Sequence, residues 1–315
     1  MIRMRRITAI LLSLLVAAGA YSTLCGSLGC EGDTAGVQLV EFPEIAGPTG
    51  NPVFEMAIDL PDMPSKMTIY KVKHPDITPD AVAAIGMKLG LDGEITTSPL
   101  GDRYTLCDEV RCLWVWRESG GVNYLRKDVT LYPLEPPELP SKEEAKQIAI
   151  DFLDKMGLSP RGAAAIRHTI GRVEMRYAGR SSTGEDVNES YVCQWLVMFD
   201  CEIDGVPLCG ATTTVGIGND GEVVQMRIVQ GELEPYKQIP IKSAEQAFKE
   251  LSQGKGSHVA NFNCRKVTLN QVYLAYWMED IMDKQDYVVP VYVFLGESLD
   301  QDGETQDFRG YCNAL

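Results

Sequence analysis

Two expected helices of this 315-residue chain end in the same pattern, KLGL at residues 88–91 and KMGL at residues 155–158. Glycine at this position can adopt the left-handed backbone conformation that stops a helix, and the leucine after it can fold back onto the last turn. Because the same ending recurs, the pattern indicates an internal repeat. We therefore expect the chain to fold as several similar units.

The starts of the helices support the same division. Each of three expected helices follows a hydroxyl side chain that can cap its first turn, and these residues are Thr78, Ser141 and Ser243. Glu144 and Gln246 stand three positions after the second and third caps and complete two capping boxes. Segments that alternate apolar and polar residues follow the helices, which is typical of antiparallel strands.

Proline-rich joins at 133–140 and 231–240 separate the expected units. We predict an α+β fold of tandem units, each with one helix packed on a three- to four-stranded antiparallel meander. The predicted order along the chain is a leader over residues 1–30, a tether over 31–52, and three units over 53–136, 137–236 and 237–315.

The clearest alternation lies in the second unit, where the odd positions of 191–203 are mostly apolar. A two-residue turn at 204–205 would place the apolar residues of this strand and of the next one on opposite faces of the sheet. A three-residue loop would place them on the same face. The matched register places Cys201 opposite Cys209. This pair is either a disulfide or two packed thiols.

The same parity argument extends to the following hairpin. A turn at Asp220-Gly221 sets Val215 opposite Met226 and Ile217 opposite Val224, so that one face stays apolar. In the third unit, Pro290 interrupts a strand pattern, which predicts an edge strand or a bulge. An exposed strand edge near Pro290 could bind a partner by strand addition.

The N-terminus predicts export. Three arginines within residues 1–6 precede an uncharged stretch over residues 7–30 that is rich in Leu, Ala and Ile. Three alternatives follow: cleavage after Ala20, lipid attachment at Cys30 in a degenerate lipobox, or an uncleaved membrane anchor. All three place the body outside the cytoplasm, and the second and third tether it to the cell membrane.

The charge excludes one class of partner. The formal net charge is −15, and without the arginines of residues 1–30, where no acid occurs, it is −18. A body that acidic repels nucleic acids and anionic lipids. Nine cysteines occur, seven of them after the leader, so at least one of these is free or pairs elsewhere. Because no CxxC motif occurs, we expect no structural zinc.

No catalytic motif is present. The sequence lacks the serine hydrolase, zinc protease and phosphate-loop patterns. A GxGxxG pattern at 216–221 precedes a strand instead of a helix, which predicts a hairpin turn. Two aspartates and a glycine at 300–303 resemble a calcium loop, but Arg309 stands where the bidentate glutamate would be, so a turn is favoured again. We predict no catalytic residue, metal or cofactor.

A family resemblance joins these observations. The segment 141–158 (SKEEAKQIAIDFLDKMGL), followed by strands and an Asp-Gly hairpin, resembles the PepSY-type unit of exported proteins. The segment 233–251 (LEPYKQIPIKSAEQAFKEL) and the strands after it are similar to the YycH/YycI-type accessory proteins of two-component systems. The resemblance implies an anchored tandem of α+β units, with a PepSY-like unit at 137–236, that binds and restrains a membrane sensor or a peptidase.

The functional prediction is therefore a non-enzymatic binding or regulatory protein outside the cytoplasm, with a protein partner. Two alternatives stay open. One is an exported hydrolase with an unrecognised site, which loss of activity on changing a single acid would support. The other is a structural component of the cell envelope, which would be abundant and would lack a stoichiometric partner.

Overall fold

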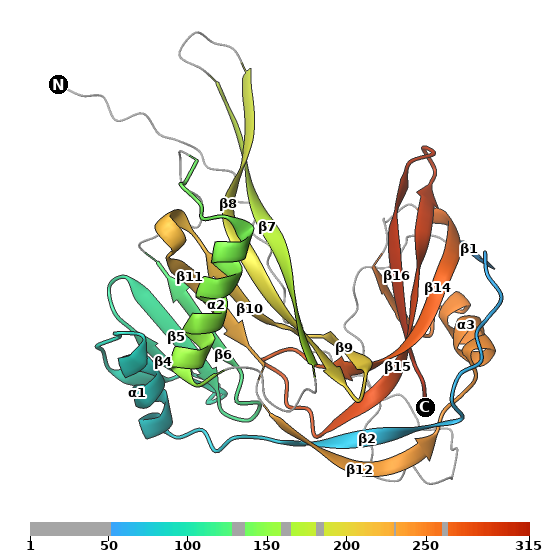
Figure 1. Ribbon diagram of the computed structural model, residues 1–315, viewed down its shortest axis with the longest axis horizontal. Coiled ribbons are helices and arrows are strands. Elements are labelled where there is room, and N and C mark those ends of the chain that lie inside the picture. Colours follow the sequence, from blue (N-terminus) through green and yellow to red (C-terminus); the bar gives the residue numbers. More distant parts are fainter. Residues whose placement is uncertain (1–51, 128–135, 159–164, 181–185, 230, 260–263) are drawn as a thin grey trace. The chain divides into compact units, whose positions relative to one another are not determined.

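The computed structural model describes the following residues (Figure 1): 52–127, 136–158, 165–180, 186–229, 231–259 and 264–315. The predicted leader with Cys30 lies outside these residues, as does the tether up to residue 51. Both stay predictions.

The helices form where the sequence places them. They are α1 (Pro79–Lys88), α2 (Lys142–Met156) and α3 (Ala244–Ser252). Thr78 accepts a hydrogen bond from the first turn of α1, and complete capping boxes begin α2 and α3. Gly90 and Gly157 both have a positive φ after the helix end, as a glycine stop requires. The predicted caps and stops are confirmed.

Sixteen strands occupy most of the other described residues. They are β1 (Val53–Met56), β2 (Lys66–Lys73), β3 (Ile95–Thr97), β4 (Arg103–Cys107), β5 (Arg111–Trp116), β6 (Val122–Arg126), β7 (Ala165–Arg180), β8 (Asp186–Ile203), β9 (Val206–Gly210), β10 (Thr213–Ile217), β11 (Val223–Ile228), β12 (Glu232–Pro240), β13 (Ser257–Val259), β14 (Cys264–Met278), β15 (Tyr287–Asp300) and β16 (Thr305–Asn313).

These strands make one mixed sheet, so the prediction of tandem helix-on-meander units is wrong. The main path runs β12-β2-β15-β14-β9-β8-β10-β11-β6-β5-β4-β3, with β1, β7, β13 and β16 paired beside it. β1 and β9 pair with β14 in parallel, which no meander contains. The strands of the expected first and second units also join, because β6 pairs with β11.

The physical reason lies at the strand edges. A meander of β3 to β6 would leave the backbone groups of β6 unpaired on one side, and β11 would have the same unpaired edge. Their pairing sets Val122 opposite Ile228, and both side chains are buried. Alternation along one strand predicts its faces, but it does not predict which other strand satisfies its edge.

The predicted three-residue loop between β8 and β9 is also wrong. Glu202 lies opposite Pro207 and Ile203 opposite Val206, which leaves Asp204 and Gly205 as a two-residue turn. Both turn residues have a positive φ. Asp-Gly is a preferred pair for this turn type, so turn chemistry determines the local register.

The apolar faces are matched further along instead. β9 separates from β8 and runs parallel to β14, with Gly210 opposite Met278. After this irregular stretch the chain returns to β8, and Val215 lies opposite Val197. Val215 also faces Met226, as predicted, but a bulge at Gly216 sets Ile217 against Val223 instead of Val224.

Pro290 does not mark an edge. It lies buried in β15 opposite Tyr276 of β14, and β16 pairs with β15 from the next residue onward. The Pro290 carbonyl accepts from the N–H of Ala314, one residue beyond β16. The N–H and C=O of a strand residue point to the same neighbouring strand. The N–H that Pro290 lacks would therefore point toward β16, at the position where the pairing with β16 has ended.

Two helices cover apolar faces of the sheet. α2 packs on β8 and β10, where Leu153, Val197 and Val215 belong to one buried cluster, and α3 packs on β16 (Figure 1). A second cluster beneath α3 contains Leu251 and Phe308. A third and a fourth cluster lie along β2, β14 and β15.

The turn after β8 is held by a tyrosine pair. The Tyr70 hydroxyl donates to the Asp204 carboxylate at 2.5 Å, and the Tyr276 hydroxyl donates to the Thr68 carbonyl at 2.9 Å. The two rings meet edge to face, 5.2 Å between centroids. Burial raises the pKa of Tyr276 to about 12. Burial, together with the hydrogen bond to Asp204, also raises the pKa of Tyr70.

These shifts predict a loss of stability in alkali. Above the ordinary tyrosine pKa of 10.0 the unfolded chain loses the Tyr276 proton, whereas the folded chain keeps it up to about pH 12. The free energy of unfolding should be constant below pH 10 from this source. Above it, the free energy should fall by up to about 1.4 kcal/mol per pH unit. Urea unfolding of the wild type and Tyr276→Phe at about pH 9, 10 and 11 measures this slope. Equal slopes for both proteins would contradict the assignment.

Candidate functional site

A cavity of about 470 Å³ opens among β8, β9, β11 and the ends of β2, β12 and β14. Its volume lies within the range of ligand sites. Phe199, Cys201 and Ile203 line it from alternate positions of β8, and Leu208 and Met278 add apolar atoms from β9 and β14. Strand alternation therefore gives this wall its apolar character.

Two strand interruptions complete the wall. The chain stops pairing with β14 at the end of β9 and begins to pair with β8 in β10, and the residues between and beside these pairings that line the cavity are Ala211, Thr212 and Thr213. Val229 lines it from the end of β11. The Ala211 N–H donates to the Met278 carbonyl at 2.9 Å, and the Val229 N–H donates to the Thr213 hydroxyl at 3.4 Å. The cavity therefore exists because β9 changes partners, which leaves space between two ladders.

The charged groups lie at one end of the cavity. Lys73 and Glu232 line it, and Lys73 forms an ion pair with Glu234 that raises the pKa of the lysine. About half of each side chain in this pair is exposed, 55% and 51%. An exposed pair of this kind contributes little to stability. Its effect is that the Glu234 carboxylate balances the positive charge of Lys73 beside the cavity.

His74 follows Lys73 and is the most unusual residue of the lining. Its side chain is 17% exposed, and Nε2 lies 3.7 Å from the Asp286 carboxylate, which is too far for a hydrogen bond. Within the described residues, both ring nitrogens are buried and make no hydrogen bond. A buried polar atom without a partner costs about 1–3 kcal/mol, so the native fold retains His74 at a cost.

Cys201 lines the cavity as a thiol. Burial, and then the neighbouring Asp200 carboxylate, raise its pKa to about 11. The thiolate is the nucleophilic form of cysteine, and at neutral pH this site disfavours it. The geometry therefore gives Cys201 the role of an apolar wall residue.

The predicted pair Cys201 and Cys209 is not bonded in the structure, where both are free thiols. Glu202 lies opposite Pro207 and Ile203 opposite Val206, a register that does not set Cys201 opposite Cys209. Leu208 and Cys201 line the cavity, whereas Cys209 packs beside Trp277 and Tyr311. Closing the bond would require both side chains to reach the same face. The disulfide stays a prediction.

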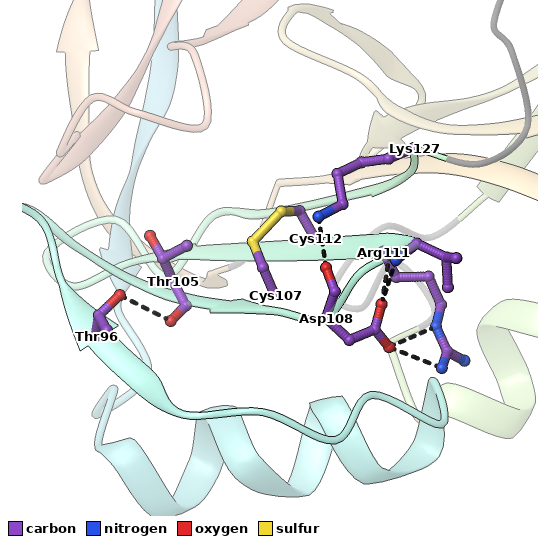
Figure 2. Close-up of a disulfide and its surroundings, with 8 residues drawn as sticks. Thr96, Thr105, Cys107, Asp108, Arg111, Cys112 and Lys127 are labelled. Atoms are coloured by element: carbon purple, nitrogen blue, oxygen red, sulfur yellow. Dashed lines mark hydrogen bonds and ion pairs between the residues drawn. A yellow bond between two sulfur atoms is a disulfide. The ribbon is translucent and has the colours of Figure 1, made fainter.

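The disulfide that the structure contains joins Cys107 and Cys112, which Figure 2 shows. These residues lie directly opposite each other at the ends of β4 and β5, with Cα atoms 4.2 Å apart. The Asp108 carboxylate between them accepts from the Val110 and Arg111 N–H groups and pairs with the Arg111 guanidinium at 2.8 Å. Sequence reasoning missed this bond, although CDEVRC between two strands is the spacing of a tight hairpin.

The two motif-like segments form turns, as predicted. Residues 219–221 make a short turn between β10 and β11, with Asp220 and Gly221 at positive φ. Asp300 accepts from the N–H groups of Asp302 and Glu304 in the turn between β15 and β16. Among the residues that the structure describes, no cluster of three His, Cys, Asp or Glu side chains could hold a metal ion.

A search of the same described residues for helices long and apolar enough to cross a membrane finds none.

No family model and no curated protein matches the sequence. An uncharacterized protein from Eubacterium rectale is similar in structure, with 12% identity and a TM-score of 0.41 over 78% of this chain and 83% of that chain. The Bacillus megaterium YpeB C-terminal domain, which is PepSY-related, shows 16% identity and a TM-score of 0.34 over 74% of this chain and 98% of that domain. Neither likeness assigns this chain to a family or bears on its function.

Proposed function

We propose that this chain is a non-enzymatic accessory protein of the PepSY-like kind that acts outside the cytoplasm. Its body is held at the membrane by the N-terminal leader and restrains a membrane sensor or a peptidase. The cavity is the contact site, and an apolar group of the partner protein fills it.

One observation carries the proposal. The cavity has apolar walls from β8, β9 and β14 and a small number of polar groups at one end. That composition is typical of binding sites, in which apolar surface supplies affinity and a few polar atoms supply orientation. The cysteine of the wall is disfavoured as a thiolate, so the same cavity is poorly suited to nucleophilic chemistry.

A second observation supports the location. Cys107 and Cys112 form a disulfide within the β4–β5 hairpin. Disulfides persist in oxidising compartments and are rare in the cytosol. The uncharged stretch at residues 7–30 supports export independently of the disulfide.

The test is a crosslinking capture of the tagged full-length protein from its own membranes, read by mass spectrometry. The proposal predicts a stoichiometric sensor or peptidase, together with a modified Cys30 or a retained leader. A mature N-terminus at Tyr21 with no stoichiometric partner would remove both the tether and the partner, and would support a different kind of exported protein.

A further inference from the structure

We draw no further inference here: the strongest candidate, the outer edge of β7, with which no other strand of the described residues pairs, carries no proposal because nothing in the structure shows what covers it.

Discussion

Replacing Gly210 by alanine is expected to lower the free energy of unfolding by about 3 kcal/mol or more. Gly210 has a φ of +93°, which side chains other than glycine rarely adopt. A Cβ at this position would also collide with the carbonyl oxygen of Met278 on β14. Gly210 is the last residue of β9 that pairs with β14. The collision would therefore push β9 away from β14 at the border of the cavity.

Gly205 is the matched control. It has a φ of +78° in the adjacent turn, and no atom lies within 4 Å of an added Cβ. Gly205→Ala should therefore cost only the backbone strain, about 1–2 kcal/mol. Urea unfolding followed by circular dichroism gives both values. Equal losses for the two variants would show that β9 does not approach β14 as closely as the structure has it.

Removal of the Cys107–Cys112 disulfide should lower the free energy of unfolding by about 2 kcal/mol. The bond closes a short loop, with a sequence separation of 5. Short loops restrict the unfolded chain less than long ones, so this value lies at the low end for disulfides. The double variant Cys107→Ala/Cys112→Ala, compared with the oxidised wild type in urea, measures it.

A reductant provides the control for this prediction. Dithiothreitol should lower the stability of the wild type to that of the double variant and should leave the double variant unchanged. Cys201, Cys209, Cys264 and Cys312 are free thiols in the structure, so reduction has no further bond to break at these four residues. A further loss in the reduced double variant would indicate another disulfide, and Cys201 with Cys209 would be the first pair to examine.

Local structure was predictable because its causes lie within a few residues. Thr78, Ser141 and Ser243 cap their helices through contacts made three residues away. Gly90 and Gly157 stop helices through their own backbone freedom. These signals do not depend on the rest of the fold.

Strand pairing was not predictable in the same way. The odd positions of β8 do face a core, with Val197 and Phe199 buried. Which strand pairs with a given strand edge depends on which other strand edges are unpaired. The alternation of residues within one strand does not give that information. The prediction for Pro290 failed for the same reason. The pairing of β15 with β16 begins only at Val291, so the N–H that Pro290 lacks is not needed by the β16 ladder.

The candidate site was beyond sequence reasoning for a geometric reason. Its lining residues come from positions as far apart as His74, Phe199 and Met278, and no motif links them. His74 is ordinary in sequence and becomes notable only when the burial of its nitrogens is known. The Cys107–Cys112 bond was within reach of sequence reasoning, since only four residues separate the two cysteines and a hairpin of that length brings its strand ends together.

The most direct test of the central claim repeats the membrane capture with two variants. Ala211→Phe fills the cavity, and Ala84→Phe adds the same ring to an exposed position of α1 as the matched control. The account predicts that the wild type and Ala84→Phe retain a stoichiometric sensor or peptidase, whereas Ala211→Phe retains at least tenfold less while remaining folded. Undiminished capture by folded Ala211→Phe would contradict the assignment of the cavity as the contact site.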